Sequence, residues 1–276
     1  MKNKGLLITL LSLIGLLIIG IIFIMVLFIN GNMSFSNFSI KYGESTNLIH
    51  EEEFGEIINK IVIDSDIYKI KIVPTMENKY NIKIYSDNNK INEVKNSNGE
   101  INIKVCEKNK VSIFGFITPL LVIEVPENYE GIFKIKSDVG DINIGDFINS
   151  SVEISSDVGN IKLNDINGVN IDIDTGNVSI KNANDAFIDA NTGNIKIEKI
   201  NDVFIETDTG NITIEELNIN KNSIINTDTG NITIGKTNDI YINAKSSIGS
   251  VKVNNNNRKS ELELNVKTDT GNIKIN

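Results

Sequence analysis

The segment Ile171-Asp-Ile-Asp-Thr-Gly-Asn-Val-Ser-Ile180 decides the fold of this chain, because copies of it recur along the C-terminal half. Residues 205–214 read Ile-Glu-Thr-Asp-Thr-Gly-Asn-Ile-Thr-Ile, and Asp-Thr-Gly-Asn returns at 228–231 and 269–272. A recurring unit of this length predicts a solenoid, in which each copy forms one rung that packs on its neighbours. With the looser copies included, eight glycines lie 17 to 22 residues apart: Gly140, Gly159, Gly176, Gly193, Gly210, Gly230, Gly249 and Gly271.

Aliphatic side chains occupy fixed positions around each of these glycines. The residues two and four positions after the glycine are Ile, Leu or Val in all eight copies, and the residue five positions before it is Ile, Val or Ala. The inward-facing side chains lie at even-numbered positions after the glycine and at odd-numbered positions before it. An alternating strand cannot make this switch without a corner at the glycine. We expect the glycine to supply a positive φ at that corner. A further apolar position, seven residues after the glycine, predicts a short third side.

These features predict an all-β fold, a parallel β-solenoid of about eight rungs over residues 131–276. At about 4.8 Å per rung, the stack would be on the order of 35–40 Å long. The crossover preference favours a right-handed coil. Residues 56–130 show period-two strands between turn signals and would start and cap the solenoid.

An aspartate stands two positions before the glycine in most copies, as Asp174 and Asp208 do. We expect each one to cap its own turn by accepting backbone N–H bonds. Stacked carboxylates about 4.8 Å apart repel by about 1 kcal/mol in water, which leaves a shared calcium ion as an alternative. The sequence lacks the Gly-Gly-x-Gly-x-Asp nonapeptide of calcium-binding β-rolls, so we expect no metal and no cofactor.

The residue content argues against an enzyme and against a nucleic-acid-binding protein. Cys106 and His50 are the only cysteine and histidine, and we expect His50 to lie in a solvated linker. The net charge of −9 and a single arginine disfavour phosphate binding. Asp172, Asp189 and Glu206 form an outward column like those of glycan-cleaving β-helices, but lysines share the column and no arginine or histidine accompanies it. We therefore expect no catalytic residue.

One outward position breaks the polar pattern. Six residues before the glycine, three consecutive rungs carry Phe187, Phe204 and Ile224. An exposed apolar stripe of this kind predicts a partner-binding surface. The alternative is that a loop or the N-terminal tether covers it.

The N-terminus predicts a membrane anchor. Residues 5–29 carry no charge and are long enough to cross a bilayer, so residues 1–29 would form a cytoplasmic tip and a single transmembrane helix. Lys2 and Lys4 precede this run, whereas glutamates follow it, which places the N-terminus in the cytoplasm and the bulk of the chain outside. Residues 30–55 would be a polar tether.

The C-terminus lies inside a rung, at Gly271-Asn-Ile-Lys-Ile-Asn276. If this rung ended the stack, its open edge would be a template for strand addition. We therefore expect weak self-association there.

The layout over residues 56–276 resembles a bacterial putative-adhesin family, a domain of unknown function whose members include LiaG-like and LiaX-like cell-envelope proteins. The resemblance rests on the opening strands, Val122-Ile-Glu-Val-Pro126 and the Gly-Asn-Ile/Val-x-Ile rungs. It implies an extracytoplasmic β-helix without known catalysis.

Three functions remain open after this comparison. The leading hypothesis is a membrane-anchored, non-enzymatic binding module of the cell envelope, with a protein or the cell wall as its partner. The alternative is a structural or sensory component of an envelope-stress response that acts through a membrane protein. The third is a carbohydrate-active β-helix enzyme.

Overall fold

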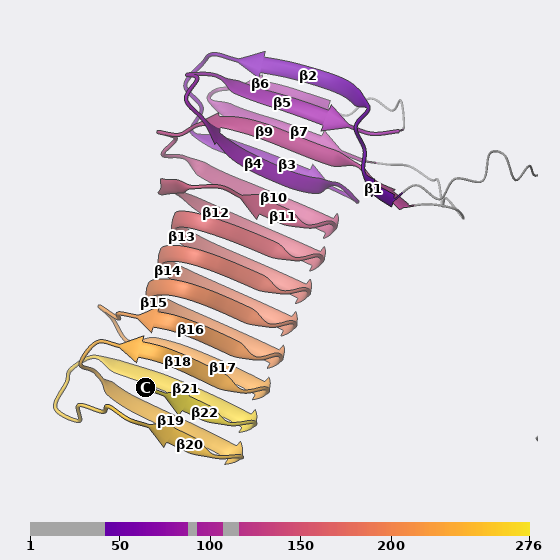
Figure 1. The fold of residues 1–276 in the computed structure, drawn as a ribbon. Coiled ribbons are helices and arrows are strands. Elements are labelled where there is room, and N and C mark those ends of the chain that lie inside the picture. Colours follow the sequence, from indigo (N-terminus) through magenta and orange to yellow (C-terminus); the bar gives the residue numbers. More distant parts are fainter. Residues whose placement is uncertain (1–41, 88–92, 107–115) are drawn as a thin grey trace, which may run out of the picture. The chain divides into compact units, whose positions relative to one another are not determined.

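The computed structural model describes residues 42–87, 93–106 and 116–276, which form strands and contain no helix (Figure 1). The all-β prediction is therefore confirmed. The expected transmembrane helix and residues 30–41 of the expected tether lie outside the described residues. Within the described ranges, no helix is long and apolar enough to cross a membrane.

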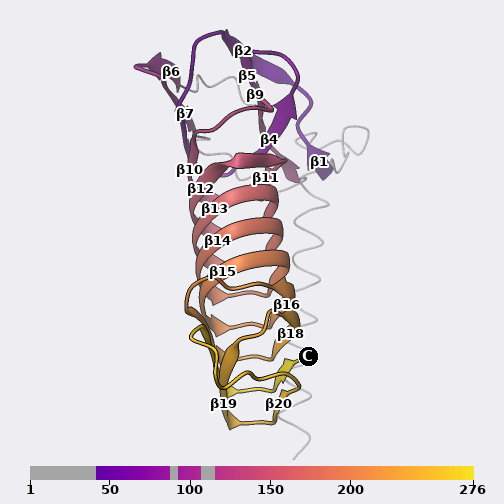
Figure 2. The same ribbon diagram turned by 90° about the vertical axis from the view of Figure 1, so that its left-hand side faces the viewer.

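The repeat region is a stack of parallel rungs with two long walls. We call the residues before each glycine the first wall and the residues after it the second wall. The central rungs are long bent strands, visible as successive turns in Figure 2. They are β12 (Phe147–Val158), β13 (Ile161–Thr175), β14 (Val178–Thr192) and β15 (Ile195–Thr209). The last three contribute to both walls, whereas the first begins on the third side and continues into the first wall.

Each wall continues beyond these rungs in both directions through parallel pairs. On the first wall the further strands are β7 (Glu100–Val105), β3 (Lys60–Ser65), β10 (Ile132–Val139), β17 (Ser223–Thr229), β21 (Glu263–Thr270) and β19 (Tyr241–Ile248). On the second wall they are β9 (Leu120–Pro126), β4 (Lys69–Thr75), β11 (Ile142–Ile144), β16 (Ile212–Leu217), β18 (Ile232–Thr237), β22 (Ile273–Ile275) and β20 (Val251–Val253).

Antiparallel strands cover the N-terminal end of the stack. On the first wall β6 (Glu93–Ser97) pairs with β7, and on the second wall β5 (Tyr80–Tyr85) pairs with β9 while β2 (Leu48–Phe54) pairs with β5. A separate pair joins β1 (Tyr42–Glu44) to β8 (Phe116–Thr118).

Strand β2 corrects the prediction for the end of the tether. Residues 48–54 are not a solvated linker, because they form the outermost strand of the cap. His50 lies on this strand and its Nε2 is 3.2 Å from a carboxylate oxygen of Glu52. The strand could not be recognised from the sequence, because Ile49 and Phe54 are its only residues that pack on the core.

The predicted inward columns form the core. In seven of the eight rungs, the side chains at two and four positions after the glycine are buried, as is the one five positions before it. The third side is buried as well, through Phe147, Ile166, Ala183, Ile200 and Leu217. The exception is the Gly249 rung, where Val251 is 42% exposed. This exception marks the Gly249 rung as the end of the stack.

The glycines are required by close stacking in every copy. A Cβ atom built on Gly193 would lie 1.8 Å from the carbonyl oxygen of Gly176, and the other seven glycines meet the rung below at 1.8 to 2.2 Å. A positive φ between 148° and 156° accompanies this in six of the eight, so the expected conformational role holds for most corners. The approach between backbones excludes any side chain at all eight.

The residue after the glycine, and not the aspartate before it, links the turns. The side-chain oxygen of Asn177 accepts the backbone N–H of Asn194 at 3.0 Å and its side-chain N–H at 3.2 Å. The same pair of hydrogen bonds links the equivalent residues of the other rungs, in the order Asp141, Asn160, Asn177, Asn194, Asn211, Asn231 and Asn272. We call this series the asparagine ladder.

The predicted turn-capping role of the aspartates is wrong. Among the described residues, no turn N–H donates to Asp174 or to the aspartates at the equivalent position. Asp174 instead accepts the side-chain N–H of Asn191, one rung further on, at 2.9 Å. The oxygen of the asparagine after the glycine reaches the next rung because stacked rungs lie close together. A single turn considered in isolation does not show this contact.

The prediction that residues 271–276 form the open end of the stack is also wrong. Strand β21 pairs with β17 on one side and with β19 on the other, and β22 lies between β18 and β20 in the same way. In Figure 1 the C-terminus lies above β19 and β20, which form the outer edge. The last rung in the sequence is therefore the last but one in space.

The outer edge also carries its own cover. The side chain of Asn256 accepts the backbone N–H of Ile242 at 3.0 Å and donates to its carbonyl at 2.8 Å. Lysines at 245 and 252 lie on the two edge strands, and charged residues are a common defence against edge pairing. The structural basis on which we expected self-association at the chain end is thus absent.

Candidate binding face on the first wall

The predicted apolar stripe is contiguous in the structure. Phe187 on β14 is in register with Phe204 on β15, which is in register with Ile224 on β17. Phe187 is 46% exposed, and the other two side chains are half-buried. No described loop encloses Phe187. We call these three side chains the apolar stripe.

The two phenylalanine rings stack on each other. Their centroids are 4.8 Å apart and their planes differ by 2°. The separation equals the spacing of the rungs, so the backbone stack sets the ring stack. Such aromatic pairs add about 0.5–1.5 kcal/mol beyond the area that they bury. This explains how an apolar pair tolerates an outward position, and the outer side of the pair remains open.

A column of carboxylates runs beside the stripe, two residues further along each strand. Asp172, Asp189 and Glu206 are in register on β13, β14 and β15, and all three are exposed. Among the described ion pairs, none involves these carboxylates. Burial and then the like charges of its neighbours raise the pKa of Asp189. The column is therefore an uncompensated negative strip along the apolar stripe.

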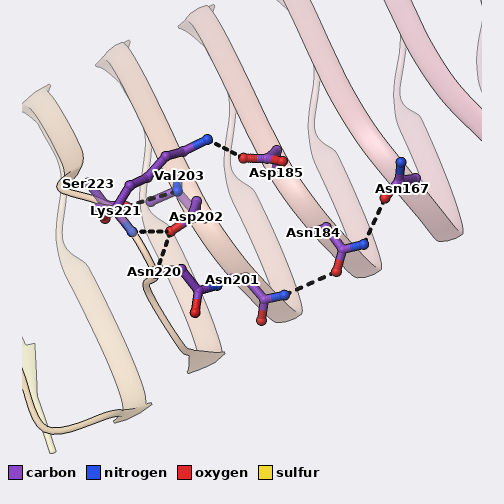
Figure 3. A network of polar contacts seen from close by, with 9 residues as sticks. All are labelled: Asn167, Asn184, Asp185, Asn201, Asp202, Val203, Asn220, Lys221 and Ser223. Carbon is purple, nitrogen blue, oxygen red and sulfur yellow. Dashed lines mark hydrogen bonds and ion pairs between the residues drawn. The ribbon is translucent and has the colours of Figure 1, made fainter.

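A polar network holds the third member of the stripe in register (Figure 3). The rung from Gly210 to Gly230 is 20 residues long, three more than the rung before it, and the extra residues form a loop before β17. Asp202, only 8% exposed, accepts the backbone N–H groups of Asn220 and Lys221 at 2.7 and 3.0 Å. The loop is thereby tied to the rung below.

Two further contacts complete this network. Ser223 accepts the backbone N–H of Val203 at 3.2 Å, which pins the start of β17 to β15 one residue before the stripe. The amine of Lys221 pairs with the carboxylate of Asp185. Beside it, Asn201 donates to Asn184 at 3.0 Å and Asn184 to Asn167 at 2.7 Å. The insertion therefore leaves Ile224 aligned with Phe204.

Sequence reasoning missed this network and two clefts. A cleft of about 440 Å³ opens on the first wall beside the stripe and is lined by Asn170 and Asp172 together with residues of β3, β10 and β12. A second, of about 780 Å³, lies near the cap and is lined by Tyr80, Tyr129, Glu56 and Glu130 among others. The first cleft is formed by side chains of separate rungs and the second mostly by segments that join strands near the cap, so no single copy of the repeat reveals either.

The face shows no catalytic arrangement. No group of three or more His, Cys, Asp or Glu side chains suited to a metal ion occurs in the part of the chain that the structure describes. His50 is on the cap strand β2 and does not belong to the first wall. What the face offers is exposed apolar area next to negative charge, an arrangement that is suited to binding.

The fold and this face define an all-β, solenoid-like protein with a surface suited to contact. The chain belongs to the Toastrack DUF4097 family, whose model matches residues 58–276. The predicted kinship with putative adhesins is confirmed. No curated protein matches the chain.

The chain is also similar to several solved structures, each at low sequence identity. A putative lipid binding protein from Parabacteroides distasonis is 10% identical with a TM-score of 0.52, covering 86% of this chain and 100% of that one. A putative adhesin from Bacteroides fragilis is 18% identical with a TM-score of 0.48, covering 85% and 99%. A putative adhesin from Parabacteroides merdae is 10% identical with a TM-score of 0.40, covering 86% and 100%. At 10% identity, the similarity to the Parabacteroides distasonis protein supports the fold and nothing further.

Proposed function

We propose that this chain is a non-enzymatic binding module that an N-terminal membrane helix displays on the outside of the cell, where it makes adhesin-like contacts in the envelope. The single observation that carries the proposal is the apolar stripe. Two stacked phenylalanines on an outward wall have no role in the core, and Phe187 exposes 46% of its surface. Exposed apolar area beside polar residues is typical of a contact surface.

Family and charge support the same function. The chain belongs to a family of putative-adhesin type, and a solved structure of similar fold is named a putative lipid binding protein. The uncharged run of residues 5–29, preceded by two lysines, favours an anchor with the solenoid outside. The negative strip beside the stripe disfavours nucleic acid and anionic lipid as ligands.

Capture by the full-length protein tests the proposal. The chain, tagged at its N-terminus and purified in a neutral detergent, is incubated with cell-wall fragments and, separately, with solubilised membrane proteins. We expect Phe204→Asp to reduce capture at least about tenfold, because it introduces a charge into the centre of the apolar contact. Ser179→Asp, an exposed change on the second wall, is the matched control.

Unchanged capture by a folded Phe204→Asp protein would contradict the role of the stripe. Topology is tested separately, by labelling a cysteine placed at Ser179 in intact cells with a reagent that does not cross membranes. The test uses a Cys106→Ser background. Absence of labelling would contradict display outside the cell.

A further inference from the structure

The negative strip continues into a positive one on the same wall. Along the stack, the positions after Asp172, Asp189 and Glu206 in the same column are Asn226 on β17, Lys267 on β21 and Lys245 on β19. Both lysines are exposed. Three carboxylates are thus followed by an amide and two lysines, and we call this series the charge column.

The charge column is complementary to a second copy of itself that runs in the opposite direction along the stack. A two-fold axis parallel to the strands, placed between β15 and β17, inverts the order of the rungs and keeps each column opposite itself. In the resulting pair of copies, Asp189 faces Lys267 and Asp172 faces Lys245, each twice by symmetry. At the centre, Glu206 faces Asn226, an amide that already donates to Glu206 within one chain at 3.3 Å.

The apolar stripe matches under the same operation. Phe204 of one copy lies opposite Ile224 of the other, again twice, so the apolar residues meet at the centre of the contact. Phe187 comes opposite Asn265, and Asn170 comes opposite Asn243. All of these pairs follow from the strand registers alone.

The geometry points to a second copy of this chain as the partner of the apolar stripe, bound face to face and antiparallel. The inference rests on the stripe being the contact surface of the proposed function, and it names the partner. The two cap ends then point in opposite directions. With anchors at the N-termini, such a pair would join two facing membranes.

The opposite arrangement is unfavourable. A two-fold axis along the stack, placed midway between the two columns, would exchange them and set the carboxylates of Asp189 and Glu206 against the phenylalanine rings of the other copy. Burial of an unpaired charge against apolar groups is costly. The wall therefore selects the antiparallel pair.

The contact is expected to be weak. Six rungs at about 4.8 Å and a wall about 20 Å wide give an area on the order of 600 Å² per copy, below the usual 800 Å². Lys267 must leave Asp269, which lies 3.0 Å from it, and at the glycine corner Asp208 comes opposite Asp228. Clustering of many copies on a surface would compensate for weak single contacts.

Charge reversal tests the pairing directly. One variant carries Asp172→Lys and Asp189→Lys, and a second carries Lys245→Asp and Lys267→Asp. In full-length protein in neutral detergent, sedimentation velocity should show a dimer for the wild type and a dissociation constant raised at least about tenfold for each variant alone. An equimolar mixture of the two should associate again, because in the mixed pair two of the four opposed pairs have inverted signs and the other two are those of the wild type.

Restoration in the mixture also shows that both variants are folded. Lys162→Asp with Lys252→Asp makes the same charge change on the second wall and should pair like the wild type. A wild type that stays monomeric, or variants that each pair as the wild type does, would overturn the inference. If capture of an envelope partner by the wild type still depended on Phe204, the proposed function would stand without it.

The antiparallel geometry has its own readout. Full-length protein in phosphatidylcholine vesicles should cluster them, each charge variant alone should not, and vesicles that carry one variant should cluster with vesicles that carry the other. Protein that floats with the vesicles but pairs only within one vesicle would contradict the bridging geometry. Protein that does not float with vesicles at all would instead contradict the proposed anchor.

Discussion

The side-chain oxygen of Asn231 accepts the backbone N–H of Asn272 at 2.9 Å, although 41 residues separate them. The intervening rung, with Gly249, lies on the far side of Asn272. Its ladder position is Ser250, which donates to Asn272 at 2.8 Å and carries no amide to continue the series. The chain thus places its regular Asp-Thr-Gly-Asn rung inside the stack and its degenerate rung at the edge.

Cross-linking tests this strand order. Asn226 is in register with Lys267 on the adjacent strand, whereas Lys245 lies one strand further away. In a Cys106→Ser background, Asn226→Cys with Lys267→Cys should form a disulfide within one chain, because adjacent rungs are about 4.8 Å apart. Asn226→Cys with Lys245→Cys should not. The reverse result would show that the rungs stack in sequence order.

A glycine corner should tolerate no side chain. Gly193→Ala would place a methyl group 1.8 Å from the Gly176 carbonyl oxygen, so the two rungs must separate. We expect a loss of about 3 kcal/mol or more in the free energy of unfolding, measured by chemical denaturation. Gly55→Ala is the control, since nothing lies within 4 Å of that Cβ position. Equal stability of the two variants would refute close stacking.

The asparagine ladder should contribute measurably to stability. Asn194 accepts two bonds from Asn211, both at 3.0 Å, and donates to Asn177. Asn194→Ala removes all three, and at about 0.5–1.5 kcal/mol for a typical bond we expect a loss of about 1.5–4.5 kcal/mol in the free energy of unfolding. Ser179→Ala, at an exposed position on the preceding rung, should change it by less than about 0.5 kcal/mol. An unchanged free energy of unfolding in Asn194→Ala would mean that hydrogen bonds to water replace those of the ladder.

The loop before β17 should depend on Asp202. Asp202→Ala leaves two backbone N–H groups without their acceptor, and we expect a loss of about 1–3 kcal/mol in the free energy of unfolding. Asp202→Asn retains a side-chain oxygen and should recover part of it. Asp185→Ala removes only an exposed ion pair and should cost less than about 1 kcal/mol. The same cost for Asp185→Ala and Asp202→Ala would argue against the anchoring role.

Asp189 should make a small pH-dependent contribution. Its pKa is raised above 3.8 by burial and by neighbouring carboxylates, so the folded state holds this proton more tightly than the unfolded state does. Below the pKa of the unfolded state the group is protonated in both states and ionisation costs no stability. As the pH rises through the pKa of the folded state, the group ionises and the folded state loses stability.

Asp189→Asn should therefore raise the free energy of unfolding at pH 7 slightly, since solvent screens an exposed carboxylate, and the gain should vanish as the pH falls below about 3.8. Denaturation at low protein concentration, where the chain is monomeric, measures it. Asp157→Asn, exposed near another corner, is the control. A loss of stability at pH 7 would show that the carboxylate has a favourable partner.

Much of the solenoid could be predicted because each rung buries the same positions. The columns around Gly176 or Gly193 recur with the parity that a corner demands, and the hydrophobic effect acts on each copy alike. The apolar stripe could be predicted for the same reason, since Phe187 and Phe204 share one outward position. The cap strand β2 could not, because its pairing with β5 is made by backbone groups that the polar residues around Glu52 conceal.

The sequence by itself determined the repeat, its inward columns and the residues of the stripe, since these depend on local periodicity and on burial. Only the tertiary structure decided which rung stands next to which. Asn272 could stack on Ser250 or on Asn231, and the asparagine ladder continues unbroken only with Asn231 on one side and Ser250 at the edge. That choice places Lys267 next to Asn226 and Lys245 at the outer edge of the charge column, because the neighbours of a rung are set by strand pairing in the stack and not by the order of the chain.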